Sequence, residues 1–308
     1  MARFVRVGVT GSTGFIGTSL VEALTRRGDE VIRFVRPSSK VAPSAATIRW
    51  RPDEGVIDVS DLERVGALDA IVHLAGTGVG DRRWTKERQR EIRESRLNST
   101  RSLVSAISSK SLRCAHLVSA SAIGYYGSRS DEVLDENSTP GVGFLASVCV
   151  DWETAASSFS DHSVPVALLR TGIVLSAKGG ALKKQLPMFR AGIGGPLGNG
   201  QQWMSPISLA DQLRAIQFIL DQRLDGAYNL TCPNPLTNAD FTRQLARIMH
   251  RPAAMAVPRR VLGAVLGSQL VDEVVLASQR VVPSALVERG FEFRSPDASS
   301  ALSSALND

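Results

Sequence analysis

Short apolar runs and amphipathic stretches alternate along the first two thirds of the chain. Apolar runs cover 4–9 and 31–35, and between them lie a glycine-rich loop, 10–17, and a segment with helical periodicity. This order predicts a strand, a turn, a helix and a second strand. Further along, the same patterns predict strands at 47–50, 70–74, 115–121 and 164–169 and helices at 58–65, 86–108, 144–159 and 209–220.

The glycine loop carries the first indication of chemistry. Gly11 can take a tight turn, Gly14 lets phosphates approach the backbone, and Gly17 lets the helix pack against its strand. A glycine turn that follows a strand and opens a helix places a dinucleotide pyrophosphate at the helix N-terminus. The loop therefore predicts a dinucleotide site.

The end of the second strand favours NADP(H) over NAD. An NAD site usually carries an acid about 20 residues after the glycines, where it binds the ribose 2′-hydroxyl. Here Arg36 stands at the strand end, Lys40 follows, and no acid lies between Val31 and Lys40. A guanidinium group pairs well with a 2′-phosphate. Arg33, on the same strand, is either a second phosphate contact or a surface residue.

Strands that alternate with helices predict an α/β fold, a Rossmann-type doubly wound parallel sheet. The pattern changes between 176 and 206, where Gly192–Gly200 is too rich in glycine for a regular element, and after 230 it is mainly helical. We therefore expect an NADP-binding Rossmann domain at 1–175, to which 206–231 return. We expect a smaller, mainly helical C-terminal substrate lobe from 176–205 and 232–308.

Composition and charge limit the classes of binding partner that we expect. A chain of 308 residues that is 43% hydrophobic can bury one large core and a smaller lobe. The formal charge is +6 without a clear basic cluster, and the cysteines and histidines lack metal-ligand spacing. No apolar segment approaches the roughly 18 residues of a membrane span, and the N-terminus leads directly into a strand. We expect a cytoplasmic protein with a small-molecule substrate, no metal, and no nucleic-acid or membrane partner; the oligomeric state stays open.

Four segments resemble the extended short-chain dehydrogenase/reductases of the nucleoside-diphosphate-sugar epimerase branch: TGSTGFIG at 10–17, HLAG at 73–76, SASAIGYYG at 119–127 and RTGIVL at 170–175. Segments 83–85, 95–96, 194–198, 278–283 and 290–293 are similar to an atypical subgroup of epimerase family proteins with a distinct C-terminal domain. The resemblance implies a nucleotide-binding Rossmann domain with a substrate lobe. Together with the glycine loop and the position of Arg36, the resemblance gives these expected cofactor contacts: Gly11, Thr13, Gly14, Phe15, Ile16, Gly17, Val35, Arg36, Leu74, Ala75, Gly76, Glu91, Arg96, Ser119 and Val174.

The usual catalytic pair of this superfamily is missing. Its reductases use a Tyr as general acid/base and a Lys four residues later, which lowers the pKa of the phenol. No lysine of this chain follows a Tyr at that spacing, and the corresponding helix has Leu145 and Cys149. We therefore expect proton transfer through Ser121 with a phenol from Tyr125 or Tyr126. Ser119 is a rival for the serine role, and loop packing is the alternative role for at least one tyrosine.

Arg96 falls on the apolar stripe of its predicted helix, beside Leu103 and Ile107. A charge there needs a partner. It meets either a cofactor phosphate or ribose, an anionic substrate group, or an acid such as Glu91 or Glu153. We assign it to the cofactor side, with Glu91 as a weaker companion.

These inferences predict an NADP(H)-binding oxidoreductase or epimerase that acts on a small or sugar-like substrate through a non-standard proton donor. The competing class is a non-catalytic NADP(H)-dependent sensor or scaffold. A nucleic-acid-associated protein is a third class, but it would need a basic patch that the sequence does not show.

Overall fold

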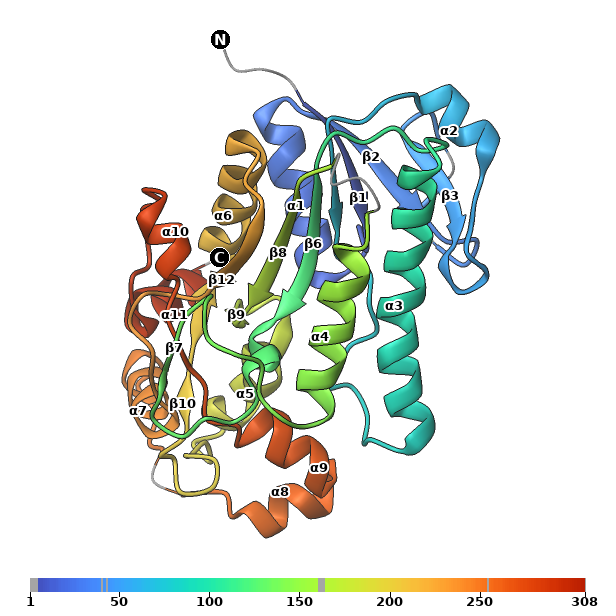
Figure 1. Ribbon diagram of the computed structural model, residues 1–308. Helices are drawn as coiled ribbons and strands as arrows, with labels where there is room; N and C mark the ends of the chain where they lie inside the picture. Colours follow the sequence, from blue (N-terminus) through green and yellow to red (C-terminus); the bar gives the residue numbers. More distant parts are fainter. Residues whose placement is uncertain (1–4, 40, 43, 160–163, 254, 308) are drawn as a thin grey trace.

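An eight-stranded sheet organises the protein, for which a computed structural model describes residues 5–39, 41–42, 44–159, 164–253 and 255–307 (Figure 1). The strand order is β12-β8-β6-β5-β1-β2-β3-β4. Neighbouring strands are parallel except β3 and β4. The strand bounds are β1 (Arg6–Thr10), β2 (Glu30–Val35), β3 (Thr47–Arg51), β4 (Val56–Ile57), β5 (Ala70–His73), β6 (Leu117–Ala122), β8 (Val166–Thr171) and β12 (Gly226–Leu230). The parallel sheet confirms the predicted Rossmann-type α/β fold.

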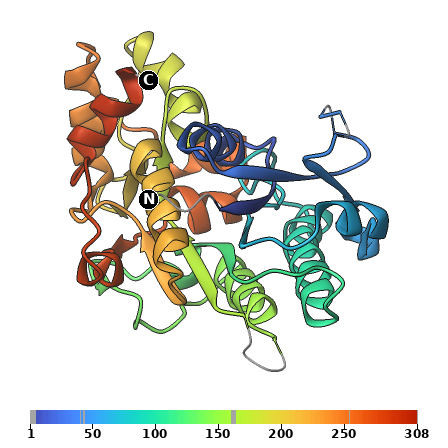
Figure 2. The ribbon, with the colours of Figure 1, turned by 90° about the horizontal axis from the view of Figure 1, so that it is seen from above.

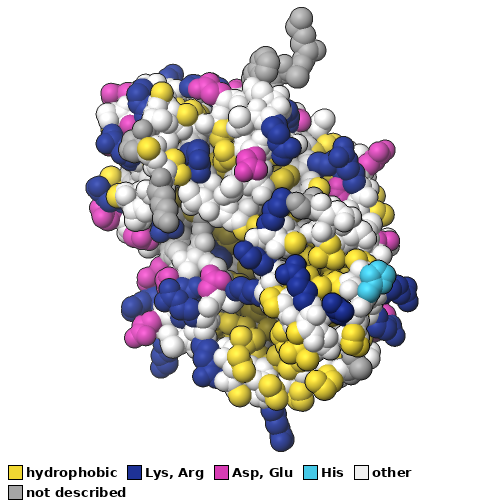
Figure 3. All heavy atoms as spheres, turned by 180° about the vertical axis from the view of Figure 1, so that it is seen from behind, with side chains coloured by type: hydrophobic (Ala, Val, Ile, Leu, Met, Phe, Trp, Pro, Cys, Tyr) yellow, Lys and Arg dark blue, Asp and Glu magenta, His cyan; other side chains and the backbone are white. Residues whose placement is uncertain are grey.

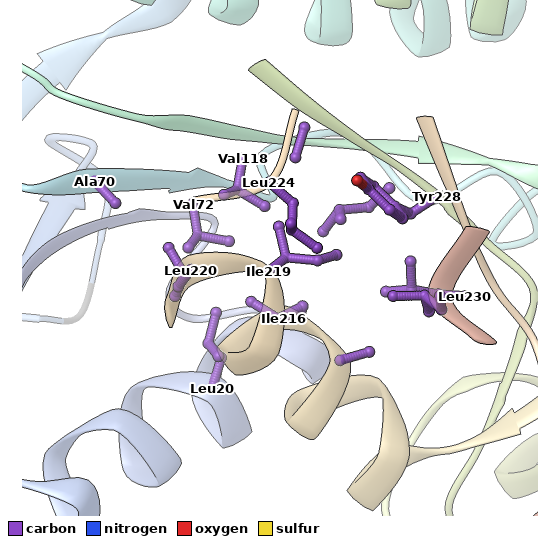
Figure 4. Close-up of a cluster of buried hydrophobic side chains, with 14 of the residues drawn as sticks. Leu20, Ala70, Val72, Val118, Ile216, Ile219, Leu220, Leu224, Tyr228 and Leu230 are labelled. Atoms are coloured by element: carbon purple, nitrogen blue, oxygen red, sulfur yellow. The ribbon is translucent and has the colours of Figure 1, made fainter. Parts of the chain in front are cut away.

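Helices cover both faces of this sheet, as the view from above shows (Figure 2). On one face lie α1 (Phe15–Arg27) and α6 (Leu209–Gln222), whose leucines and isoleucines pack on Val72 and Val118 (Figure 4). On the other face lie α2 (Val59–Val65), α3 (Lys86–Ser108) and α4 (Phe144–Ala156). Residues far apart in sequence thus share two cores, one on each side of the sheet.

The C-terminal lobe lies beyond the carboxyl ends of the strands, where the arrows of β6 and β8 point in Figure 1. Its helices are α5 (Gly180–Arg190), α7 (Asn238–Ile248), α8 (Arg259–Leu266), α9 (Ser268–Leu270) and α11 (Ala298–Asn307), with a π-helical turn at Val271–Val275. The short helix α10 (Ser284–Glu288) packs instead beside β12, where Leu286 joins the core of the sheet (Figure 1). A separate core joins α5, α7 and α11. Open α/β sheets bind ligands outside the carboxyl ends of their strands, so the lobe covers the expected site.

Short strand pairs join the lobe to the sheet. They are β9 (Ile173–Leu175) with β11 (Pro206–Ser208), β10 (Trp203–Met204) with β13 (Leu236–Thr237), and β7 (Val133–Leu134) with β14 (Arg280–Val281). After β11 the chain returns through α6 to β12, which pairs with β8 in the main sheet. The chain therefore passes between sheet and lobe several times.

Helix α5 differs from the sequence expectation, which gave no regular element between 176 and 206. Leu182, Leu186 and Phe189 are buried on one side of this helix, at the spacing of a helical face. The glycines on both sides of α5 concealed this short amphipathic pattern. Residues 192–200, which we expected to be irregular, form turns and extended loop.

Apolar side chains are exposed on one face of the lobe (Figure 3). On the face opposite to Figure 1, hydrophobic side chains gather in the half of the molecule that contains α5 and α7 to α9, and Lys and Arg border them (Figure 3). Met188 on α5 and Val261 and Val265 on α8 belong to this half and are exposed. No residue of α8 is buried.

Candidate functional site

The glycine turn after β1 leaves the N-terminus of α1 open. Gly11 has φ +63°, and a Cβ on Gly17 would lie 2.1 Å from the Gly11 carbonyl oxygen. The backbone N–H of Gly14 donates to that oxygen over 2.9 Å. The first turn of α1 has no side-chain cap and no acid. Its N–H groups therefore suit a phosphate.

A cavity of about 480 Å³, here called the cofactor cavity, opens beside this turn. It is lined by Gly11, Ser12, Thr13, Phe34, Val35, Arg36, Ser38, Ser39, Trp50 and Ala75. Arg36 is exposed and has no ion-pair partner among the described residues. Its guanidinium and the hydroxyls of Ser38 and Ser39 suit a 2′-phosphate. Residues and cavity therefore fit NADP(H).

Sequence reasoning missed five residues of this lining: Ser12, Phe34, Ser38, Ser39 and Trp50. Ser38 and Ser39 directly follow Arg36 and Pro37, so a search for phosphate-binding hydroxyls near Arg36 could have found them. Trp50 lies on β3, and no local pattern relates it to the glycine turn.

Arg33 has a different place from Arg36. Its Nε donates to Ser12 Oγ, and its Nη2 donates to the Ser12 carbonyl oxygen, both over 3.2 Å. It supports the glycine turn from β2 and does not line the cofactor cavity. Lys40 lies outside the described residues.

The loop after β5 borders the cofactor cavity through Ala75. The backbone N–H groups of Leu74 and Ala75 both donate to Thr10 Oγ1, over 3.1 and 3.2 Å. The Thr10 hydroxyl lies 2.7 Å from Nδ1 of the wholly buried His73, and burial lowers the pKa of His73 to about 3. A neutral imidazole therefore holds this loop against the glycine turn.

Several other expected cofactor contacts lie apart from the lining of this cavity. The ring of Phe15 packs so closely on Gly179 that a Cβ there would lie 2.3 Å away. Ile16 and Val174 pack with the core. Ser119 is wholly buried within β6 and does not line the cofactor cavity.

Glu91 is paired within its own helix. Arg88 Nη1 donates to Glu91 Oε2 over 2.7 Å, and this hydrogen bond is the main reason why the pKa of Glu91 is low. Its side chain is about half exposed and lines neither cavity.

A second cavity of about 310 Å³, here called the substrate cavity, lies between α4 and the C-terminal lobe. The sheet and α4 contribute Ala122 at the end of β6, Gly124 after it, and Leu145, Val148, Cys149 and Trp152 on α4. The remaining wall comes from Ile173 on β9, Trp203 and Met204 on β10, and residues 273–275, 277 and 279 of the lobe. Leu145 and Cys149, which replace the usual Tyr and Lys, both face it. Burial raises the pKa of Cys149 to about 12, so its sulfur stays a thiol.

Arg96 lines the substrate cavity where it approaches the loop after β5. A Cβ on Gly76 would lie 3.4 Å from the Cγ and Cζ atoms of Arg96. Arg96 Nη1 donates to the carbonyl oxygens of Thr77 (3.0 Å) and Ile92 (2.9 Å), and its Cζ lies 5.1 Å from the centre of the Trp152 ring. Burial lowers the pKa of Arg96.

Neither acid that we considered as a partner pairs with Arg96. Glu91 pairs with Arg88, and Glu153 pairs with Arg170. Among the described residues Arg96 has no acidic partner, so a ligand anion can take this role.

The three expected catalytic hydroxyl residues do not line either cavity. Ser121 Oγ donates to Glu153 Oε1 over 2.6 Å. Tyr126 donates to Asn229 Oδ1 (2.8 Å), accepts from Arg170 Nη1 (3.0 Å) and is wholly buried. Burial raises the pKa of this phenol to about 12.

Tyr125 lies beside the same buried group. Its ring centre lies 3.6 Å from the Cζ atom of Arg170, which stacks against it. Arg170 also donates to both carboxylate oxygens of Glu153 over 2.9 Å. These contacts form a structural network between β6, α4, β8 and β12.

Glu273, from the π-helical turn, lines the substrate cavity and was missed by sequence reasoning. Its Oε2 accepts from the backbone N–H of Leu145, and its Oε1 accepts from Gln269 Nε2, both over 2.9 Å. Nothing in the local sequence points to this residue, which lies 128 positions from Leu145.

In the described part of the chain, no group of three or more His, Cys, Asp and Glu residues could hold a metal ion. The helices described there include none of the length and hydropathy that crossing a membrane requires.

Comparisons with known proteins agree with this geometry. An epimerase family protein of Mycobacterium bovis, Mb2239, is 41% identical over 93% of this chain and 93% of its own length. A crystal structure of human epimerase family protein SDR39U1 with NADPH is 31% identical, with a TM-score of 0.88 over 98% of this chain and 99% of that one. A structure described as the nucleoside-diphosphate sugar epimerase of Corynebacterium glutamicum is 34% identical, with a TM-score of 0.76 over 99% of this chain and 58% of that one.

Two family descriptions cover most of the sequence. Residues 257–305 match a domain of unknown function, DUF1731. Residues 7–231 match the NAD dependent epimerase/dehydratase family. The chain therefore belongs to the NAD dependent epimerase/dehydratase family, in the form that carries this C-terminal domain.

Proposed function

We propose that this protein is an NADP(H)-dependent oxidoreductase or epimerase that acts on a small molecule in the substrate cavity. The observation that carries the proposal is Arg36, which has no ion-pair partner among the described residues and lies beside Ser38 and Ser39 at the cofactor cavity. The human relative whose crystal structure contains NADPH supports the same cofactor. Cys114, Cys149 and Cys232 are free cysteines, which favours a reducing compartment such as the cytoplasm.

The residues divide the work between the two cavities. The N–H groups at the start of α1 would hold the pyrophosphate, and Arg36 would hold the 2′-phosphate. Arg96, where the loop after β5 meets the substrate cavity, would donate to a phosphate or ribose oxygen of the cofactor. With NADPH held in this way, a hydride would be available for a carbonyl carbon of the substrate, and a proton would complete the alcohol.

The source of that proton is open to test. Ser121, Tyr125 and Tyr126 could supply it only if a hydroxyl reached the substrate cavity, which none of them lines. We therefore assign these three residues to the network around Arg170 and Glu153. The stability and turnover of Tyr125→Phe and Tyr126→Phe distinguish this structural role from proton transfer.

The test combines binding with turnover. NADPH is titrated into the purified protein by calorimetry, and NADPH absorbance is then followed with a panel of ketones and aldehydes. We expect binding and consumption of NADPH with at least one compound. Absence of NADPH binding would overturn the proposal. Binding without consumption of NADPH by any compound would contradict the oxidoreductase and favour the epimerase, which regenerates its cofactor in each turnover, or the sensor.

A further inference from the structure

The charges of the substrate cavity are few. Among the described residues that line it, the charged side chains are Arg96 and Glu273. Most of the remaining wall is aliphatic or aromatic, with Leu145, Val148 and Trp152 on one side. Such a wall favours apolar ligand surface, because burying it removes it from water.

The two charges are held by different elements of the wall. Arg96 contacts Gly76 and Thr77, in the loop that also borders the cofactor cavity, and the proposed function gives it a cofactor oxygen. Glu273 comes from the lobe, and its carboxylate accepts hydrogen bonds from Leu145 on α4 and from Gln269 on α9. A substrate therefore meets a carboxylate there and no further cation, and a carboxylate repels phosphate groups.

Most neutral polar groups of the wall already have partners within the protein. Ser205 Oγ donates to the Gln279 carbonyl oxygen (2.8 Å) and accepts from Val281 N–H (2.9 Å). Gln279 Nε2 donates to the Ile123 carbonyl oxygen over 2.9 Å. Asn238 accepts from a backbone N–H through its Oδ1 and donates through its Nδ2. These groups hold the wall together and leave few partners for sugar hydroxyls.

Two side chains of the wall differ, because neither has a hydrogen bond among the described residues: the Trp203 indole on β10, whose N–H can donate, and the Gln185 amide on α5. The Gln185 amide can donate to a carbonyl oxygen or accept from a hydroxyl. A single carbonyl or hydroxyl would be matched by Gln185 and Glu273. A sugar with several hydroxyls would lose hydrogen bonds to water without replacing them, at roughly 1–3 kcal/mol each.

We infer that the substrate cavity binds a neutral, largely apolar ketone, aldehyde or alcohol, and that it excludes nucleoside diphosphate sugars. The cavity volume of about 310 Å³ is at the small end for ligand sites and agrees with a compact substrate. The inference rests on the proposed function, because it assumes that the cofactor occupies the neighbouring cavity and engages Arg96.

The test uses saturation-transfer NMR on the full chain with saturating NADP⁺. The probes are acetophenone, a neutral aromatic ketone, and uridine diphosphate. We expect saturation transfer to acetophenone and none to uridine diphosphate at the same concentration. Leu145→Trp fills the cavity and should abolish the acetophenone signal. The matched control is Val142→Trp, because Val142 is 90% exposed and lines neither cavity.

A second variant protects the test against misfolding. Val274 lines the cavity from an exposed position on the lobe, so Val274→Trp should also weaken the acetophenone signal. An unchanged NADP⁺ signal in each variant shows that the protein is folded. Absence of an NADP⁺ signal from the unmodified protein would contradict the proposed function itself. With NADP⁺ bound, the inference is overturned by a uridine diphosphate signal that Leu145→Trp removes, or by an acetophenone signal that is absent or unaffected by both variants.

Discussion

The carboxylate of Glu273 accepts a hydrogen bond of 2.9 Å from the backbone N–H of Leu145, in the first turn of α4. This contact joins the C-terminal lobe to the helix in which Leu145 and Cys149 replace the superfamily's usual catalytic pair. Gly143, which precedes α4, has φ +115°, and a Cβ there would lie 3.1 Å from Glu273 Oε2. Glycine at 143 thus makes room for the carboxylate, which satisfies one free N–H of the helix.

The Glu273 contact should contribute to stability as a helix cap does. Glu273→Ala leaves the Leu145 N–H without its acceptor, and we expect a loss of about 0.5–2 kcal/mol in the free energy of unfolding. Glu273→Gln keeps an acceptor oxygen and should lose less. Urea denaturation measures both, with the exposed Glu288→Ala as control. A loss in Glu273→Ala no greater than that of the control would contradict the assignment.

Phenylalanine variants of Tyr126 and Tyr125 test whether these side chains have a structural or a catalytic role. Tyr126→Phe removes the buried hydroxyl that donates to Asn229 Oδ1 and accepts from Arg170 Nη1, so we expect about 1–3 kcal/mol of lost stability in urea. The Tyr125 hydroxyl has no hydrogen bond among the described residues, and Tyr125→Phe should stay within about 0.5 kcal/mol of the unmodified protein.

Once a turned-over compound is known, both tyrosine variants should keep the turnover of the unmodified protein per folded molecule. Removing a general acid/base would instead lower the rate by roughly 10²- to 10⁴-fold. Such a drop in either variant, with the fold intact, would return proton transfer to that phenol.

Valine substitutions at Gly14 and Gly17 should have different effects, the first on NADPH binding and the second on stability. A Cβ at Gly14 has one close neighbour, the Gly11 oxygen at 3.2 Å, whereas at Gly17 the same oxygen would lie 2.1 Å away. Gly14→Val should therefore keep the fold and lose NADPH binding, because its methyl groups occupy pyrophosphate space. Gly17→Val should lose stability first. Thermal denaturation and calorimetry distinguish the two, and NADPH binding by Gly14→Val would show that the turn is misassigned.

His73 should make the protein less stable in acid. Its pKa is about 3 in the fold, below the roughly 6.5 of an unfolded histidine, so the unfolded state binds the extra proton between these values. Stability is full above about pH 6.5 and falls by up to ~1.4 kcal/mol per pH unit below it. Urea denaturation at several pH values should show a shallower slope for His73→Gln. Equal slopes would mean that His73 is not buried in its neutral form.

The glycine turn, the Arg36 position and the alternation of strands with helices could be predicted because each depends on neighbours in sequence. The periodicity of α3 placed Arg96 on an apolar stripe, and in the structure Arg96 is partly buried. Its partner could not be predicted, because Glu91 and Glu153 pair with Arg88 and Arg170. That choice depends on how α3, α4 and β8 pack together.

The substrate cavity was beyond sequence reasoning for a similar reason. Val79 and Gln279 line it together although 200 positions separate them, and Glu273 reaches α4 only after the lobe folds back. The sequence also placed Ser121 at the expected strand end. Its direction toward Glu153 depends on a buried network that no motif encodes.

The NADP(H) assignment at Arg36 is tested most directly by calorimetric titration with NADPH and NADH. A charge-assisted contact of roughly 1.5–3 kcal/mol predicts that NADPH binds about ten- to a hundredfold more tightly. Arg36→Glu should erase or invert this preference. Arg51→Glu, on the neighbouring strand where Arg51 pairs with Glu54, should leave it unchanged. Equal affinities of the unmodified protein for NADPH and NADH would contradict the account.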